Sequence, residues 1–146
     1  MINDRNEQVE EYEEWLSFAK MDFDVAMHLN DSFYPKPVSI ICYHCQQAAK
    51  KAVKVLVVYF GCQGGMPKVH DITFLLNQIK NIIYEEKGIV VSRELLKMAD
   101  YLSKYGVMSR YPNEIEVDEV QTIKALTSSK EILDWAQYVV DANKDK

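Results

Sequence analysis

The chain has 146 residues, of which 48% are hydrophobic and 27% are charged, with only five glycines and four prolines. A chain of this length can bury a sizeable core unaided, and its shortage of turn-forming residues argues against an all-β fold. The formal net charge of −5 argues against a protein that coats nucleic acid by bulk attraction, because such binding needs an excess of lysine and arginine.

The first residues lack the basic start and the apolar segment of a signal peptide, and no stretch reaches the roughly 18 apolar residues that cross a bilayer. The cysteines Cys42, Cys45 and Cys62 form an odd and sparse set, which does not suit a secreted disulfide framework. We therefore expect a cytoplasmic protein without a membrane segment.

Charge is distributed unevenly along the chain. Residues 1–31 hold nine acids and two bases, whereas residues 32–70 hold no acid, five lysines and two histidines. The middle segment is therefore where we expect an anion to be attracted.

The first expected helix covers residues 7–30, where apolar residues recur at steps of three and four. We expect Phe18, Met21 and Val25 to widen this apolar stripe. The nearby glutamates predict a solvated face rather than a metal site. The two prolines at 35 and 37 end the helix, and Pro37 suits the first turn of the next one.

A second helix is expected from about Val38 to Phe60. Its core face carries alanines that allow a neighbouring helix to approach closely, and the residues on that face are Ile41, Cys42, Cys45, Ala48, Ala49, Ala52, Leu56 and Tyr59. A different face carries His44, Gln47, Lys51 and Lys54, spaced three, four and three residues apart. This spacing predicts that the four side chains line one edge of the helix.

Three further helices are expected. Asp71 can cap a shorter third helix, residues 84–91 are expected to be a connector, and Ser92 opens a fourth. Asp118 with Gln121 three residues later resembles the capping box of a last helix. Apolar residues at helical spacing follow each start: Ile72, Leu75, Leu76 and Ile79; Leu95, Leu96, Ala99, Leu102 and Tyr105; and Val120, Ile123, Leu126 and Leu133. The pattern predicts an all-α protein with no linker that divides the chain.

Cys42 and Cys45 have Cys-x-x-Cys spacing, but both fall inside the second expected helix and no second pair follows. A structural zinc site usually has four ligands, with its first pair on a turn. We interpret the two cysteines as buried and inert, and we expect no metal and no cofactor.

Eight residues are candidates for ligand binding. His44, Gln47, Lys51 and Lys54 could meet a base or a phosphate, while Lys68 and His70 precede the third helix and Arg110 and Tyr111 precede the last one. Four of them have a structural alternative: His44 could be satisfied by another helix, His70 could serve local capping, Arg110 could pair with an acid of the first helix, and Tyr111 could pack. Phosphate-loop, dinucleotide-binding, zinc-protease and serine-hydrolase motifs are absent from the sequence.

Several segments together resemble one known family. The stretch CYHCQQAAKKAVKVLVVYFG (42–61) resembles the second helix of HEPN domains (higher eukaryotes and prokaryotes nucleotide-binding). KVHDITFLL (68–76) resembles the family's His-Asp element, and SRYPN (109–113) resembles its Arg-Tyr-Pro segment. The first helix also fits, through Trp15, Ala19, Asp22, Ala26 and Leu29.

The resemblance implies a single HEPN domain over residues 1–146, an up-and-down bundle of about five helices, four long and one short. It also implies a homodimer with a groove for nucleotide or RNA, often working with a minimal nucleotidyltransferase in a toxin-antitoxin context. The family's nuclease branch needs a histidine five to seven residues after an arginine, and none follows Arg5, Arg93 or Arg110 at that spacing. Without this acid/base group we assign no catalytic residue and expect a binding protein.

The leading hypothesis is therefore a HEPN module that binds nucleotide or RNA through the eight candidate residues. Two alternatives stay open. One is a noncanonical, metal-independent ribonuclease using His44, His70 and Arg110, and the other is a scaffold that only recruits a partner protein.

Overall fold

The computed structural model describes residues 4–61, 71–106 and 118–142, and these form five α-helices with no strand among them. The helices are α1 (Asp4–Ser32), α2 (Val38–Tyr59), α3 (Ile72–Lys87), α4 (Arg93–Ser103) and α5 (Glu119–Asp141). The expected all-α fold is confirmed. The fourth helix is the shortest, with 11 residues.

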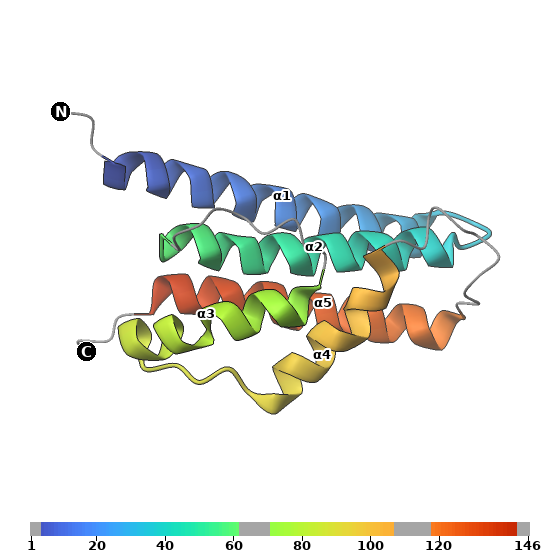
Figure 1. Ribbon diagram of the computed structural model, residues 1–146. Coiled ribbons are helices and arrows are strands. Elements are labelled where there is room, and N and C mark those ends of the chain that lie inside the picture. Colours follow the sequence, from blue (N-terminus) through green and yellow to red (C-terminus); the bar gives the residue numbers. More distant parts are fainter. Residues whose placement is uncertain (1–3, 62–70, 107–117, 143–146) are drawn as a thin grey trace.

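The long helices α1, α2 and α5 lie side by side, and α3 and α4 cover the opposite side of the bundle from α1 (Figure 1). Helix α2 runs antiparallel to α1, while α2, α3 and α5 run in the same sense (Figure 1). Helix α2 contacts each of the other four helices, and its contact with α1 is the most extensive in the bundle. The residues of α2 therefore determine how the other elements are placed.

Local capping explains where three of the helices start. The Asp71 carboxylate accepts hydrogen bonds from the backbone amides of Thr73 and Phe74, and the Ser92 hydroxyl accepts one from Leu95. Asp118 and Gln121 form the expected capping box, in which each side chain accepts a hydrogen bond from the backbone amide of the other. Such caps satisfy amide groups that have no partner inside the helix.

Small residues lie where the helices meet. The alanines of α1 and α2 that face the interior are fully buried: Ala19, Ala26, Ala48, Ala49 and Ala52. Larger apolar side chains complete the core, and Ile41, Leu56, Leu75, Ile79, Leu102 and Ile132 are among the fully buried ones. Because alanine adds little bulk, α1 can approach α2 closely enough for polar side chains of the two helices to meet.

Two expectations are wrong in detail. Residues 84–87 continue α3 rather than forming a connector, and the helix ends at Gly88, whose positive φ of 70° suits the left-handed turn that follows. The sequence pattern also predicts a wider apolar stripe on α1 than the bundle buries. Phe18 and Met21 are 50% and 57% exposed, because they lie beside the surface that contacts α2.

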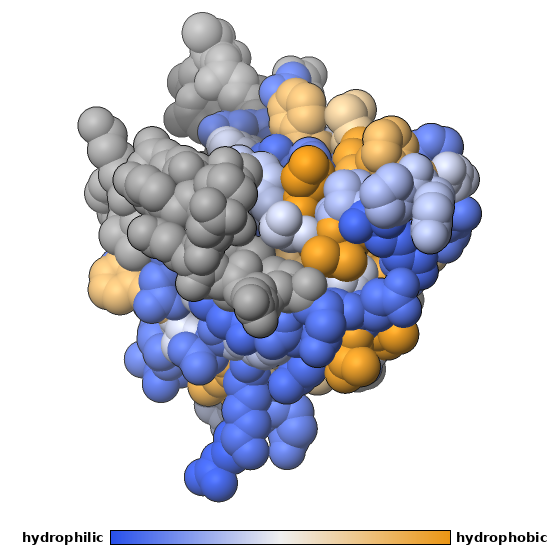
Figure 2. Space-filling view, turned by 90° about the vertical axis from the view of Figure 1, so that its right-hand side faces the viewer, coloured by the Kyte–Doolittle hydropathy of each residue, from blue (hydrophilic) through white to orange (hydrophobic). Residues whose placement is uncertain are grey.

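The last helix shows the same effect, since Val120 and Ile123 of its expected stripe are exposed. Exposed apolar side chains also occur at the end of the bundle where α1 turns into α2, where they include Phe33 and Tyr34. Figure 2 views this end and shows apolar side chains gathered in places among hydrophilic ones.

Candidate functional site

The four candidate residues of α2 lie on one edge of the helix, as their spacing predicts. His44, Gln47, Lys51 and Lys54 are all half-buried, whereas the flanking core positions are fully buried. The edge therefore lies at the border between the interior and the surface. We call these four residues the α2 edge.

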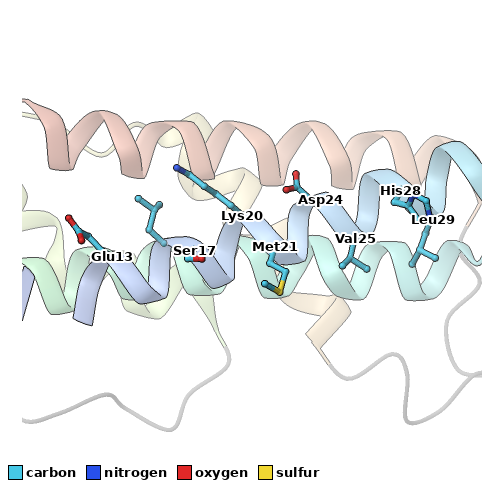
Figure 3. A pocket seen from close by; sticks show the side chains of 9 residues that line it. Glu13, Ser17, Lys20, Met21, Asp24, Val25, His28 and Leu29 are labelled. Carbon is cyan, nitrogen blue, oxygen red and sulfur yellow. The ribbon is translucent and has the colours of Figure 1, made fainter. Parts of the chain in front are cut away.

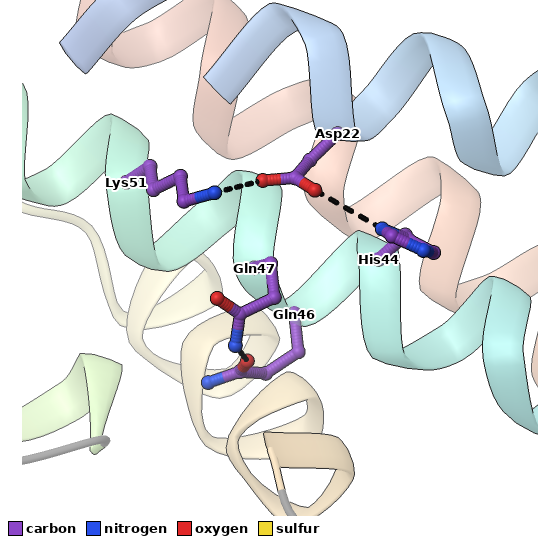
Figure 4. Close-up of polar contacts among 5 residues, drawn as sticks. All are labelled: Asp22, His44, Gln46, Gln47 and Lys51. Carbon is purple, nitrogen blue, oxygen red and sulfur yellow. Dashed lines mark hydrogen bonds and ion pairs between the residues drawn. The ribbon is translucent and has the colours of Figure 1, made fainter. Parts of the chain in front are cut away.

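Asp22 of α1 joins two members of the α2 edge (Figure 4). One carboxylate oxygen lies 3.0 Å from His44 Nδ1, and the other accepts a hydrogen bond from Lys51 Nζ at 2.5 Å. The Asp22 side chain is 14% exposed, and those of His44 and Lys51 are 27% and 26% exposed. One carboxylate thus fixes an imidazole and an ammonium group almost two turns apart on α2, while leaving both accessible to solvent.

Asp22 was not among the residues that the sequence pattern marks as functional. In the sequence it contributes to the resemblance of the first helix, and it is a polar position between Ala19 and Ala26, both of which are fully buried. A carboxylate flanked by two core positions three and four residues away must lie close to the neighbouring helix. This position between two core alanines is the sequence feature that could have identified Asp22.

Aromatic rings of α1 support the lysines of the α2 edge. Lys54 Nζ lies 5.0 Å from the centre of the Trp15 ring, and Lys51 Nζ lies 6.0 Å from that of Phe18. An ammonium group is attracted to the face of an aromatic ring. Burial, together with the positive charge of Lys51, lowers the pKa of Lys54.

Lys50 adds a further positive charge beside this edge. It is almost completely buried, and burial together with the charges of Lys54 and Lys51 lowers its pKa, while Asp22 acts in the opposite direction. Three lysines within two turns of one helix therefore repel one another. An anion placed near them would reduce that repulsion.

Gln47 connects the α2 edge, through Gln46, to the residues just after α4. Its side-chain amide donates a hydrogen bond of 2.8 Å to the Gln46 side-chain oxygen, and Gln46 is fully buried (Figure 4). A Cβ atom at Gly106, just after α4, would lie 3.2 Å from Gln46 Nε2. The glycine thus leaves room for the buried amide, and Gln47 is oriented by it rather than turned freely toward solvent.

The other predicted ligand residues lie outside the described residues. These are Lys68, His70, Arg110 and Tyr111. Cys62, which is not a predicted ligand residue, also lies outside the described residues. Among the predicted set, the structure therefore brings together His44, Gln47, Lys51 and Lys54. That Lys68, His70, Arg110 and Tyr111 lie near the α2 edge stays a prediction.

A shallow hollow follows the outer surface of α1 (Figure 3). It is lined along the helix by Glu13, Lys20, Asp24 and His28, with Met21 and Val25 between them. Acidic and basic side chains alternate here and are spread over more than four turns of one helix. This surface has neither a dominant charge nor converging groups, and we assign no chemistry to it.

Cys42 and Cys45 are fully buried in α2, as expected for an inert pair. Burial raises the pKa of the Cys42 thiol to about 11 and that of Cys45 to about 12, although hydrogen bonds with Thr122 and Ser129 act in the opposite direction. Among the described residues, no group of three or more metal-ligating side chains comes together.

We expect both thiols to resist alkylation in the folded protein. At pH 8 a thiol with a pKa of about 11 is roughly 0.1% ionised, against about a quarter for an ordinary cysteine. In a Cys62→Ser variant, iodoacetamide should therefore react at least about 100-fold more slowly with the native than with the urea-unfolded chain. Rapid labelling of native protein, read by mass spectrometry, would contradict the burial of this pair.

Comparison with known proteins agrees with this architecture. The model of the HEPN domain matches residues 12–139, which includes α2, α3, α4 and almost all of α5. The chain belongs to the HEPN family. The resemblance seen in the second helix and in the His-Asp element is thereby confirmed at the level of the family.

Two solved structures have the same fold as this HEPN protein. The archaeal HEPN homologue ST0689 aligns with a TM-score of 0.63 and 22% identity, over 89% of this chain and 98% of its own. TT1696 from Thermus thermophilus aligns with a TM-score of 0.68 and 24% identity, over 88% of this chain and 97% of its own. A search of curated proteins found no match. In the described part of the HEPN chain, no helix combines the length and apolarity needed to traverse a bilayer.

Proposed function

We propose that this HEPN protein binds a nucleotide or a segment of RNA at the α2 edge. The observation that carries the proposal is the crowding of Lys51 and Lys54 beside His44 on one half-buried edge of α2, which Asp22 contacts. Phosphate groups neutralise such a cluster, and this neutralisation supplies most of the sequence-independent affinity for nucleic acid. The exposed aromatic ring of Phe18, beside Lys51, offers a surface on which a base could stack.

The proposal includes the predicted residues outside the described ranges. Lys68, His70, Arg110 and Tyr111 would complete the ligand contacts. Lysine and arginine suit phosphate, the imidazole can donate or accept a hydrogen bond, and tyrosine can stack on a base.

We further propose that residues 1–146 form one HEPN domain, which acts in the cytoplasm as a homodimer with a minimal nucleotidyltransferase, in a toxin-antitoxin-like context. Membership of the HEPN family supports this arrangement. Light scattering on the purified protein measures its mass, and affinity purification of the tagged protein from its natural host identifies co-purifying subunits. A monomer at micromolar concentration would contradict the homodimer. The absence of any nucleotidyltransferase after purification would contradict the proposed partner.

The ligand role is tested by titrating the purified protein with ATP, with other nucleotides and with a 12-residue single-stranded RNA. We expect the Lys51→Gln/Lys54→Gln variant to bind RNA about tenfold more weakly, because two phosphate contacts are lost. The slope of log affinity against log salt should decrease by about 1.4, or about 0.7 for each lost contact with a single strand.

The matched control is Lys20→Gln/Lys80→Gln, which removes two exposed lysines from α1 and α3. Its net charge equals that of the Lys51→Gln/Lys54→Gln variant. Binding to this control should change less than twofold. Equal losses in the two double variants would show that overall charge, rather than the α2 edge, determines affinity. No binding of any probe at low salt would overturn the proposal.

The Asp22 and His44 pair favours a second candidate, a noncanonical ribonuclease. A carboxylate hydrogen-bonded to one ring nitrogen orients an imidazole, which is the arrangement of a general base. If this candidate is right, a large excess of purified protein cleaves RNA without metal and His44→Ala abolishes the cleavage. Intact RNA after incubation with the unmodified protein would end this alternative.

A further inference from the structure

A second basic cluster lies away from the α2 edge, in a pocket where α4 and α5 meet the start of α3. Its basic residues are Lys97 on α4, Lys104 directly after α4, and Lys124 on α5. The pocket is open to solvent and has a volume of about 760 Å³. This volume falls within the range of about 300–1,000 Å³ that is typical of small-ligand sites.

Two of these lysines share one aromatic ring. Lys104 Nζ lies 4.5 Å from the centre of the Tyr101 ring, and Lys124 Nζ lies 4.3 Å from it. The two ammonium groups can therefore be no farther apart than these two distances combined. Lys104 also lies 5.1 Å from the centre of the Tyr105 ring. Two positive charges, one directly after α4 and one on α5, are thus held within that combined distance of each other.

The tyrosine that holds them is itself fixed. The Tyr101 hydroxyl donates a hydrogen bond of 3.0 Å to the backbone carbonyl of Gln121, and it accepts one of 2.9 Å from the hydroxyl of the fully buried Tyr105. These contacts tie the end of α4 to the first turn of α5. The lysines therefore rest on a rigid platform, which reduces the entropy they lose on binding a ligand.

The carboxylates of the described lining do not neutralise this cluster. Asp71 is directed toward the amides at the start of α3 and lies 3.3 Å from the Ser103 hydroxyl. Asp100 is exposed. Within the ranges that the structure describes, no ion pair involves Lys97, Lys104 or Lys124. Among the described lining residues, three ammonium groups face two carboxylates, which leaves an excess of positive charge in that part of the pocket.

A path of contacts links the pocket to the α2 edge. Gly106 lines the pocket and lies against the Gln46 amide, which accepts a hydrogen bond from Gln47 of the α2 edge. The two basic regions are therefore separated by a pair of hydrogen-bonded amides.

We propose that this pocket binds a phosphate group, with Lys104 and Lys124 as its principal ligands and Lys97 as a third cation. The phosphate belongs to a nucleotide or to an RNA backbone, and the inference in this respect rests on the proposed function. It adds to that function a second anchoring point, formed by α4 and α5 rather than by α2.

The test follows backbone amide signals of the isotope-labelled full chain by NMR during titration with tripolyphosphate, which carries no base. We expect the largest shifts at Lys97, Tyr101, Lys104 and Lys124. The Lys104→Gln/Lys124→Gln variant should weaken tripolyphosphate binding at least tenfold, while Lys80→Gln/Lys130→Gln, which removes exposed lysines outside the pocket, should change it less than twofold. Parallel titrations with ATP and with an RNA lacking terminal phosphates show which source of phosphate the pocket prefers.

The outcomes separate this inference from the proposed function. If Lys104→Gln/Lys124→Gln binds tripolyphosphate, ATP and RNA as the unmodified protein does, whereas Lys51→Gln/Lys54→Gln does not, the pocket is not a phosphate site and the α2 edge stands. If Lys104→Gln/Lys124→Gln loses binding while Lys51→Gln/Lys54→Gln binds fully, the pocket is supported as a phosphate site and the α2 edge is rejected. If the unmodified protein shows no shifts with any of the three ligands, both are overturned. Unchanged thermal unfolding of Lys104→Gln/Lys124→Gln confirms that these two lysines act on binding rather than on folding. Because Lys51→Gln/Lys54→Gln loses the ion pair between Lys51 and Asp22, circular dichroism at the titration temperature confirms that this variant is folded.

Discussion

The Asp22→Asn variant is expected to be less stable than the unmodified protein and to bind anions more tightly. The substitution preserves the size of the side chain but removes the charge that holds His44 and Lys51. Because Asp22 is largely buried, we expect a loss of about 2 kcal/mol in the free energy of unfolding, or about 6 °C in Tm. Since the carboxylate also competes with phosphate for the two groups, its removal should raise RNA affinity about fivefold.

Asp24→Asn is the matched control for this experiment. Asp24 lies two residues farther along the same helix and is exposed, with no ion pair to any described residue. Its substitution changes the net charge equally but should alter Tm by less than about 1.5 °C and RNA affinity by less than twofold. Thermal unfolding and RNA titration on both variants give the comparison. A destabilised Asp22→Asn protein with unchanged affinity would mean that the α2 edge is only a structural contact between α1 and α2.

The Leu56→Ala variant is expected to lose more stability than the Asp22→Asn variant. Leu56 is fully buried on α2, the helix that contacts all four others. Removing three carbons from such a position loses apolar burial and leaves a cavity, which costs about 2–5 kcal/mol. We expect Tm to fall by about 10 °C.

Urea and thermal unfolding measure this effect, and Val120→Ala serves as the control. Val120 is 73% exposed on α5, so its truncation should change stability by less than about 0.5 kcal/mol. A Leu56→Ala protein as stable as the Val120→Ala protein would show that α2 is not the centre of the core. The two unfolding curves should otherwise be parallel, because both variants expose similar surface on unfolding.

Much of the fold could be predicted because its determinants are local. The caps at Asp71, Ser92 and Asp118 act on amide groups two or three residues away, so a short window of sequence contains both partners. Apolar spacing likewise identified the core face of α2. The same spacing overestimated the buried stripe of α1 at Phe18 and Met21, because periodicity does not tell how much of a face a neighbouring helix covers.

The site was only partly predictable for the same reason. Helical spacing correctly placed His44, Gln47, Lys51 and Lys54 on one edge, but it did not identify what that edge would meet. Neither the Trp15 ring beneath Lys54 nor the Tyr101 ring shared by Lys104 and Lys124 follows from the order of residues along one helix.

By itself, the sequence determined the helical class, the capped helix starts, the polar edge of α2 and the resemblance to HEPN domains. The packing of helices decided that Asp22 binds His44 and Lys51, which are 22 and 29 residues away in the chain. It also decided that Lys104, directly after α4, and Lys124 of α5 both lie against the Tyr101 ring. Hydrogen bonds within a helical turn are encoded by neighbours in sequence, whereas contacts between helices depend on the distance and angle at which the whole core packs.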